Sequence, residues 1–258
     1  MCSSDLHLLA HLLSKPRAWL YAFSEHQISA QQQADFEALL SRRKRGEPIA
    51  YITGRRGFWS FDLQVSPDTL IPRPETELLV ELVLALLHPS KPASVLDMGT
   101  GSGAIALAIA IERPLASVCA VDASLAALKV AQANAAELKL LNVQFEHSNW
   151  YASIKHRRFN VIVSNPPYIE DGDAHLNQGD LRFEPHSALA SGADGLADIR
   201  IIIAGARKHL EPGGYLLLEH GWQQGALVRE LFAQYCFAEV ATEQDLEQRD
   251  RVSMGKIL

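Results

Sequence analysis

From residue 94 to the end of the chain, short strand patterns alternate with helical patterns, and this alternation restricts the possible folds more than any other feature. Residues 94–97 and 118–122 are apolar runs typical of buried strands, and residues 103–111 between them have a helical pattern of small side chains. Further strand patterns lie at residues 143–146, 161–164, 215–219 and 252–257. Such alternation predicts an α/β fold with a mainly parallel, doubly wound sheet and helices on both faces.

The first part of the chain predicts a separate helical unit, which we place at residues 1–48. Leucines between Leu6 and Leu13 recur at helical spacing, and Ser29 followed by Gln32 resembles a capping box at the start of a second helix. A Gly-Glu-Pro sequence ends that helix. These helices are too short to bury a core alone, so we expect them to pack on each other or on the remainder of the chain.

Residues 49–74 predict a β-hairpin that links the two parts of the chain. Residues 51–53 and 58–63 alternate as strands do, with glycines between them. Pro74 then suits the first turn of a helix, because a proline there loses no hydrogen bond and acidic residues follow it. The rest of the chain, residues 75–258, forms the predicted α/β domain.

Composition and charge exclude several classes of protein. The 258 residues are 48% hydrophobic and 21% charged, as in a globular rather than a disordered protein, and the net charge of −6 argues against a protein dedicated to long duplex DNA. The cysteines Cys2, Cys119 and Cys236 lack metal-ligand spacing, so we expect neither a zinc site nor a disulfide framework. No apolar stretch is long enough to span a bilayer and no signal peptide is recognisable, so we expect a cytoplasmic protein without a membrane partner.

A glycine-rich segment follows the first predicted strand of the sheet. Residues 97–103 read Asp-Met-Gly-Thr-Gly-Ser-Gly, and the glycines Gly99, Gly101 and Gly103 permit a tight turn that a ligand can approach closely. Asp122 ends the next strand, where its carboxylate can accept hydrogen bonds from both hydroxyls of a ribose. The spacing differs from the G-x-G-x-x-G of dinucleotide sites, and no P-loop lysine is present. The segment therefore fits S-adenosylmethionine, which contains a ribose but no phosphate.

Trp150 follows the third predicted strand and has two interpretations. It can pack against an adenine, with Asn149 or a nearby backbone group reaching the polar edge of the base. It can equally be a core residue, since tryptophan side chains are usually largely buried.

A later strand is followed by the tetrad Asn165-Pro166-Pro167-Tyr168. Prolines lack an N–H and force the preceding residue into an extended conformation, so regular structure ends here and the backbone offers acceptors. Asn165 then has a side-chain oxygen free to accept from a planar NH2 group, on which Tyr168 can stack. Alone, the tetrad is also compatible with an ordinary turn after a strand. Together with the glycine loop and Asp122, in this order, it predicts a methyl-transfer site.

The motifs D-x-G-T-G-S-G and V-S-N-P-P-Y are the signature of class I S-adenosylmethionine-dependent methyltransferases that act on an exocyclic or amide nitrogen. Over nearly its whole length the sequence resembles the HemK/PrmC family, which methylates the glutamine of the Gly-Gly-Gln motif in peptide chain release factors. Further segments that carry this resemblance are I-P-R-P-E-T-E at 71–77, F-E-P at 183–185, D-G-L at 194–196 and L-E-H-G at 218–221. The resemblance implies a seven-stranded, Rossmann-like methyltransferase sheet, preceded by helices that recognise the substrate protein.

The resemblance also implies roles for individual residues. Contacts to S-adenosyl-L-methionine are implied for Gly99, Thr100, Gly101, Ser102, Gly103, Asp122, Trp150 and Asn165. Contacts to the substrate glutamine are implied for Asn165, Pro166, Pro167 and Tyr168. We hypothesise that the Asn165 side-chain oxygen and the Pro166 carbonyl accept the two amide hydrogens while Tyr168 packs on the amide plane, which makes these three the catalytic residues. We expect no metal.

The chain departs from the family pattern in three places, one of which is Gly57 in the hairpin, where the family commonly has an acidic residue. Asn149 stands where the family often has aspartate, and its carbonyl can still accept from the adenine amine. Family members usually have one more helix before the segment equivalent to Asp5, a difference that concerns docking of the release factor rather than the chemistry.

Three other functions are compatible with parts of the pattern. A sister family methylates a glutamine of a ribosomal protein, but its segments equivalent to 71–77 and 219–221 typically read differently. A DNA or RNA adenine methyltransferase could hold a flipped base on the same tetrad, but the acidic charge and the lack of an added target-recognition domain argue against it. A catalytically silent binding protein would not need Asn165 and the glycine loop. We therefore expect a monomeric enzyme whose partner is a release factor and which binds no nucleic acid stably.

Overall fold

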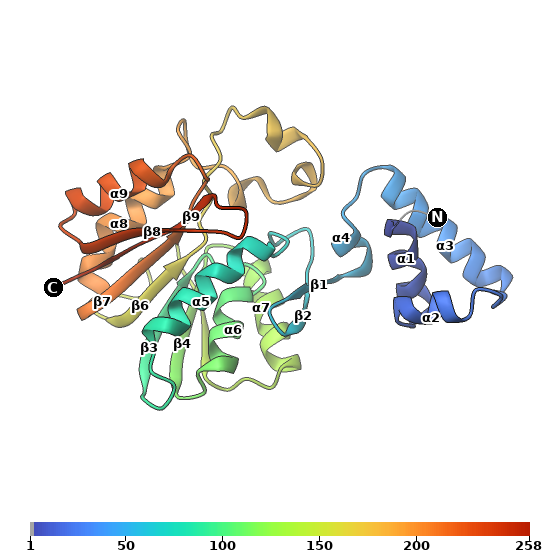
Figure 1. Ribbon diagram of the computed structural model, residues 1–258, viewed down its shortest axis with the longest axis horizontal. Coiled ribbons are helices and arrows are strands. Elements are labelled where there is room, and N and C mark those ends of the chain that lie inside the picture. The colour runs from blue at the N-terminus through green and yellow to red at the C-terminus, as the bar shows by residue number, and fades with distance from the viewer. Residues whose placement is uncertain (1–2) are drawn as a thin grey trace.

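The computed structural model describes residues 3–258, and it consists of two unequal parts (Figure 1). A small unit of helices stands at one end of the molecule, and an α/β domain forms the other end. A short connecting region lies between them. Cys2 lies outside the described residues, and Cys119 and Cys236 are free cysteines.

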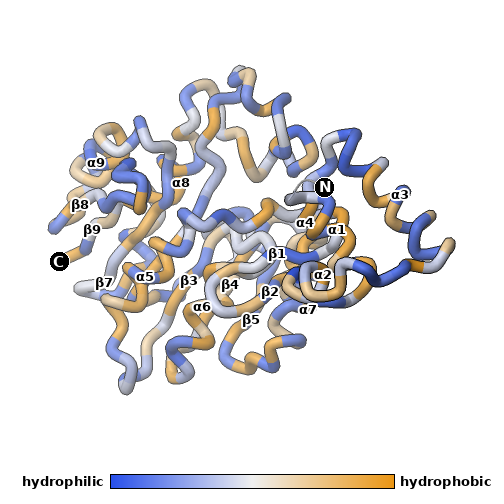
Figure 2. The backbone as a smooth tube through the Cα atoms, turned by 45° about the vertical axis from the view of Figure 1, so that its right-hand side comes forward, coloured by the Kyte–Doolittle hydropathy of each residue, from blue (hydrophilic) through white to orange (hydrophobic). Residues whose placement is uncertain are grey.

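From residue 3 onwards, the small unit contains the helices α1 (Ser3–Leu13), α2 (Arg17–Ala22) and α3 (Ala30–Lys44). The first predicted helix and the capping box are confirmed, since the Gln32 N–H donates to Ser29 Oγ at 3.1 Å and the Ser29 N–H donates to Gln32 Oε1 at 2.8 Å. Helix α2 was not expected from the sequence. No residue of α3 is buried, and hydrophilic residues alternate with hydrophobic ones along it (Figure 2), so much of this helix stays accessible to solvent.

The connecting region is not a hairpin throughout. Residues Ile49–Thr53 form helix α4, and the strand expected at residues 51–53 is therefore wrong. Gly54, with φ of +70°, ends the helix. Tyr51 is buried, and its hydroxyl donates to the carbonyl of Thr69 at 2.7 Å. A three-residue alternation is too short to distinguish a strand from one helical turn.

The predicted hairpin exists in a shorter form, as strands β1 (Arg55–Phe58) and β2 (Phe61–Gln64). It is attached to helix α7 (Leu125–Glu137) of the α/β domain. The Gln64 N–H donates to Asn134 Oδ1 at 2.7 Å, and Asn134 Nδ2 donates back to the Gln64 carbonyl at 3.0 Å. These paired hydrogen bonds fix the position at which the chain enters the α/β domain.

Seven strands form the sheet of this domain, in the order β5-β4-β3-β6-β7-β9-β8. Their bounds are β3 (Ala93–Met98), β4 (Ala116–Asp122), β5 (Val143–His147), β6 (Phe159–Ser164), β7 (Leu210–Glu219), β8 (Ala238–Gln244) and β9 (Asp250–Lys256). Strands β3 to β7 are parallel, and β9 runs antiparallel to β7 and β8. The predicted mainly parallel, seven-stranded sheet is confirmed, and β8 is the strand that no sequence pattern indicated.

Helices cover both faces of the sheet, as predicted. On one face lie α5 (Glu77–Leu86), which follows the short 3-10 helix η1 (Pro74–Thr76), α6 (Ala104–Glu112) and α7; on the other lie α8 (Ala197–His209) and α9 (Gly225–Gln234). Successive strand residues such as Val95 and Leu96 enter opposite cores, because side chains alternate along a strand. No helix in residues 3–258 is both long and apolar enough to cross a membrane.

Residues 165–196 connect β6 with α8, and the long segment of residues 170–196 within this connection projects towards the small unit (Figure 1). It contains three 3-10 helices, η2 (Ala174–Asn177), η3 (Leu181–Phe183) and η4 (His186–Ala188). Arg182 Nη2 donates to the carbonyl of Arg45 at 2.9 Å, which joins this segment to the end of α3.

Candidate active site

The sheet brings the three predicted motifs to one edge. In the parallel register, Met98 pairs with Val121 on one side and with Ser164 on the other. The glycine loop, the strand-end aspartate and the tetrad each begin one residue later. All three therefore leave the sheet side by side at its carboxyl edge, where ligands bind in folds of this kind.

A pocket of about 440 Å³ opens at this edge. Of the predicted site residues, those that line it are Gly99, Gly101, Asp122, Trp150, Asn165 and Pro167. The predicted residues that do not line it are Thr100, Ser102, Gly103, Pro166 and Tyr168. The pocket therefore brings together six of the predicted site residues, and the other five do not line it.

Asp122 holds the glycine loop in shape. Its Oδ2 accepts from the N–H of Gly101 at 2.9 Å, and its Oδ1 accepts from the N–H of Ser124 at 2.8 Å. Gly101 has φ of +56°, and a side chain added there would meet no atom within 4 Å, so its backbone borders open space. An ionised carboxylate offers about four acceptor positions, and two remain free here. Asp122 can thus hold the loop and still accept from the hydroxyls of a ligand.

Thr100 and Ser102 support the loop from inside the domain, where both are buried. Thr100 Oγ1 donates to Asp97 Oδ2 at 2.6 Å, and the N–H of Ala106 donates to the same oxygen at 3.2 Å. The carbonyl of Ser102 accepts from Asn134 Nδ2 at 2.9 Å. These contacts connect the loop to α6 and, through Asn134, to the hairpin.

The structure is compatible with both interpretations of Trp150, since this residue lines the pocket and also packs against the apolar core. Its Nε1 donates to Asp198 Oδ1 at 3.1 Å, and Ser191 Oγ donates to Asp198 Oδ2 at 2.7 Å. The indole is thereby fixed close to Gly99, so that a Cβ built on this glycine would lie 3.7 Å from the ring. Asn149 lines the same pocket. A flat apolar surface beside an amide suits a nucleobase.

The residues present fit S-adenosylmethionine, the cofactor expected from the sequence. Asp122 offers free acceptor positions for ribose hydroxyls, Trp150 offers a flat face for the base, and the loop at Gly101 permits close backbone approach. Beneath the loop, Asp97 Oδ1 is buried without a hydrogen-bond partner among the described residues.

The NH2 group of the Asn165 side chain already has a hydrogen-bond partner within the protein. Its Nδ2 donates to Thr76 Oγ1 at 3.1 Å, which leaves Oδ1 as the acceptor available to a ligand. Thr76 belongs to the I-P-R-P-E-T-E segment and is 4% exposed. Sequence reasoning assigned no role to Thr76, because no local pattern links it to a residue 89 positions away.

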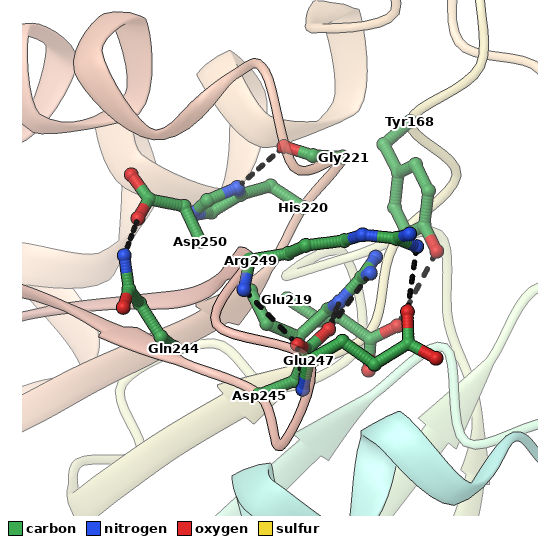
Figure 3. Close-up of polar contacts among 10 residues, drawn as sticks. Tyr168, Glu219, His220, Gly221, Gln244, Asp245, Glu247, Arg249 and Asp250 are labelled. Carbon is green, nitrogen blue, oxygen red and sulfur yellow. Dashed lines mark hydrogen bonds and ion pairs between the residues drawn. The ribbon is translucent and has the colours of Figure 1, made fainter.

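The other tetrad residues divide between pocket and interior. Pro167 lines the pocket and Pro166 is buried. The hydroxyl of Tyr168 donates to Glu219 Oε1 at 3.3 Å (Figure 3), and its backbone carbonyl accepts from Gln224 Nε2 at 3.0 Å. Burial, followed by the nearby Glu219 carboxylate, raises the pKa of the Tyr168 hydroxyl. Stacking of Tyr168 on a substrate amide stays a prediction, since its ring does not line the pocket.

Two segments that the sequence did not assign to the site complete the pocket, residues 67–70 and residues 185–188. Buried Glu184 joins them, because its carboxylate accepts from the Ile71 N–H at 3.4 Å and pairs with Arg73 at 2.5 Å. Burial raises the pKa of Glu184, against the lowering effect of Arg73. The F-E-P sequence at 183–185 could have indicated that residues 185–188 belong to the site. No sequence motif indicated this for residues 67–70.

The Asp97→Asn variant is expected to gain stability over the wild type as the pH rises, measured as the difference between their free energies of unfolding. Burial raises the pKa of Asp97 to about 7, against an ordinary value of 3.8, so the folded state binds the extra proton between these values. The free energy of unfolding of the wild type therefore decreases as the pH rises from about 4 towards 7. The amide of the Asp97→Asn variant does not titrate, so this decrease is absent in the variant. The expected relative gain for the Asp97→Asn variant between pH 5 and pH 8 is on the order of 1–4 kcal/mol.

Denaturant unfolding of both proteins without cofactor at pH 5, 6, 7 and 8 measures this difference. Asp35→Asn is the matched control, because Asp35 is exposed on α3 and its substitution should give a flat difference. A difference between wild type and Asp97→Asn that does not change with pH would contradict the expectation.

Family models and related proteins identify the group to which this sequence is similar. A model described as PrmC N-terminal domain matches residues 6–54, and one described as Methyltransferase small domain matches residues 75–183. The Release factor glutamine methyltransferase of Xylella fastidiosa (strain Temecula1) is 55% identical over 249 residues, which are 96% of this chain and 90% of that protein. The protein of the same name from Escherichia coli (strain K12) is 49% identical over the same shares of both chains.

A solved structure of a methyltransferase from Pyrococcus furiosus covers 84% of this chain and 96% of its own, with a TM-score of 0.57 and 18% identity. This likeness concerns the fold. The two sequence relatives extend over both parts of the molecule, and they agree with the resemblance found in the sequence. The chain belongs to the family of release factor glutamine methyltransferases.

Proposed function

We propose that this protein transfers the methyl group of S-adenosyl-L-methionine to the side-chain amide nitrogen of the glutamine in the Gly-Gly-Gln motif of peptide chain release factors. The observation that carries the proposal is the amide of Asn165, whose Nδ2 is held by Thr76 and whose Oδ1 is left to accept from an incoming NH2 group. This acceptor lines the same pocket as Gly101 and Asp122 of the cofactor side.

When bound, the cofactor would supply the methyl group of its sulfonium sulfur, which keeps the electron pair of the broken S–CH3 bond as S-adenosylhomocysteine, and the methylated amide nitrogen would lose one proton to water. Asp122 would bind the ribose hydroxyls, Trp150 would pack on the adenine with Asn149 at its polar edge, and Gly99 and Gly101 would admit the methionine part close to the backbone. These contacts orient the donor at the carboxyl edge of β3 and β4.

The acceptor nitrogen of an amide is a poor nucleophile because its lone pair is delocalised into the carbonyl. In the proposed mechanism, Asn165 Oδ1 and the Pro166 carbonyl would accept the two N–H groups and so fix the orientation of the amide nitrogen. Pro167 forms the adjacent wall, and Tyr168 is the residue proposed to pack on the amide plane. Such orientation of reactants can supply several kcal/mol of the barrier.

The N-terminal unit is proposed to recognise the substrate protein. Its surface carries two exposed aromatic side chains, with Tyr21 65% and Phe23 55% exposed. It contacts the segment 170–196 through Arg182 and through an ion pair of Arg43 with Asp180 at 3.4 Å. A substrate that acts on the ribosome would place the reaction in the cytoplasm.

Incubation with labelled S-adenosylmethionine and a purified release factor tests the proposal. Mass spectrometry of the digested product should find one added methyl group on the glutamine of Gly-Gly-Gln. A release factor with alanine in place of that glutamine should remain unlabelled. In a cell extract, label on a ribosomal protein or on nucleic acid, with none on release factor, would contradict the proposed substrate.

A further inference from the structure

We propose that Glu219 is a positioning residue: through the hydroxyl of Thr76 it sets the amide orientation of Asn165. Glu219 also holds the hydroxyl of Tyr168, so one buried carboxylate fixes both ends of the tetrad. The hydrogen bonds of Asn165 with Thr76 and of Tyr168 with Glu219 stand on the geometry of the described residues, the link from Thr76 to Glu219 is the inferred step, and the effect on catalysis rests on the proposed function.

The sheet places Glu219 next to the tetrad. In the parallel register of β6 and β7, Ser164 pairs with Leu218, so the following residues, Asn165 and Glu219, lie beside each other at the carboxyl edge. Glu219 is 1% exposed. Burying a carboxylate costs free energy unless other groups donate hydrogen bonds to it. The groups that donate to Glu219 therefore indicate its role.

The direction of each hydrogen bond follows from the chemistry of the groups. An amide nitrogen can only donate, so Thr76 Oγ1 accepts from Asn165 Nδ2 at 3.1 Å and its own proton must point elsewhere. The Thr76 hydroxyl interacts with Glu219 and lowers the pKa of that carboxyl. Glu219 Oε2 is buried and has no hydrogen-bond partner among the residues described, so it is free to accept the Thr76 proton. The carboxylate thus provides the acceptor that turns the Thr76 proton away from Asn165.

Tyr168 occupies the other oxygen of the same carboxylate, with Oη donating to Glu219 Oε1 at 3.3 Å (Figure 3). Its backbone carbonyl is held by Gln224, and Gly195 approaches so closely that a Cβ there would lie 2.3 Å from that carbonyl oxygen. Tyr168 is therefore fixed at its ring and at its backbone, and the tetrad has little freedom to shift.

The surroundings of Glu219 raise its pKa overall, so the carboxyl is protonated below that pKa and becomes a full acceptor above it. Burial raises the pKa of Glu219 most, and Glu75 adds to this effect, whereas Arg251 of β9, which pairs with Asp245 at 3.1 Å, lowers it. The net result is a pKa of about 7. Above this value the carboxylate is ionised and can accept from both hydroxyls at once.

The orientation of Asn165 decides whether a substrate amide can bind. The two sides of an asparagine amide have nearly the same shape, so its orientation is determined by its hydrogen-bond partners. With Nδ2 on Thr76, Oδ1 can accept from the substrate. In the reversed orientation an NH2 group would face the substrate NH2 group, and two donors cannot bond.

Three variants test the network. Thr76→Val removes the hydroxyl at nearly constant shape, Thr76→Ser keeps it, and Glu219→Leu removes both acceptor oxygens. The first readout is hydrogen exchange of the Asn165 side-chain NH2 by NMR, assigned by its loss in Asn165→Ala, with the exposed Asn177 as internal reference. The second is kcat for methyl transfer at saturating substrates, together with the Kd of S-adenosylhomocysteine.

We expect the Asn165 NH2 to be protected in the wild type and in Thr76→Ser, and to exchange as fast as Asn177 in Thr76→Val and Glu219→Leu. We expect kcat to fall about 10-fold or more in the latter two and to stay within about threefold in Thr76→Ser, with Kd for the product little changed in all three. Protection that is unchanged in Thr76→Val and Glu219→Leu, or equal kcat in Thr76→Val and Thr76→Ser, would overturn the inference. A wild type that methylates no release factor refutes the proposed function, and the exchange data still decide on the network.

Discussion

Asn165→Ala is expected to lower kcat for methyl transfer by about 10²–10³-fold, the loss typical when one preorganised hydrogen-bonding group of an active site is removed. The variant loses the Oδ1 acceptor that holds the substrate NH2 group. The cofactor side of the pocket keeps Asp122 and the glycine loop, so the Kd for S-adenosylhomocysteine should change by no more than about threefold.

Steady-state kinetics with a release factor and calorimetry with S-adenosylhomocysteine measure the two quantities separately. Asn177→Ala is the matched control, because it removes the same side chain from an exposed position on η2. Wild-type kcat in Asn165→Ala would rule out the proposed role of the tetrad asparagine. If Asn165→Ala lowered only the affinity for the cofactor and left kcat unchanged, Asn165 would be a cofactor-binding residue and the proposed contact with the substrate amide would be wrong.

Asp122→Ala is expected to have the opposite signature, with cofactor affinity reduced by about 10²-fold or more. Two hydrogen bonds from ribose hydroxyls to a carboxylate contribute about 1.5–3 kcal/mol each. The substitution also releases the N–H groups of Gly101 and Ser124, which Asp122 holds at 2.9 Å and 2.8 Å, so the loop loses its shape as well.

Calorimetric titration with S-adenosylhomocysteine measures this effect, and kcat at saturating cofactor should fall much less than the affinity. Asp122→Asn separates the two contributions, because an amide oxygen can still accept from a ribose hydroxyl but its NH2 group cannot accept from the backbone. Asp35→Ala controls for the change in net charge at a distant exposed position. An unchanged Kd in Asp122→Ala would exclude the pocket as the cofactor site.

Much of the fold could be predicted from the sequence because its signals are local. The helix at α6 and the strands β3 and β4 follow from periodicity, and Ser29 with Gln32 marks the start of α3 through a four-residue motif. The errors have equally local causes. The strand expected at 51–53 is a single helical turn, stabilised by the buried Tyr51 and its contact with Thr69. Strand β8 has no strong pattern, and its pairing with β9 at the sheet edge defines it.

The residues of the candidate site likewise fall into those that the sequence could predict and those that it could not. Gly101 and Asp122 could be assigned because the carboxyl end of a parallel strand is a place that sequence alone can locate. Asp198 and residues 67–70 could not, since they reach the pocket from segments remote in the chain. Glu184 and Gly195 lie in short motifs that carried the family resemblance, but no spacing rule indicated what they contact.

The sequence by itself determined the order of strands and helices apart from α2, α4 and β8, and the strand ends at which Asn165 and Asp122 stand, because periodicity and breaker residues act over a few positions. Tertiary structure decided which way the amide of Asn165 faces and where the Tyr168 hydroxyl is held. Their partners, Thr76 and Glu219, lie 89 and 51 positions away along the chain. A hydrogen bond between such distant residues depends on the packing of whole strands and helices, which no local pattern encodes.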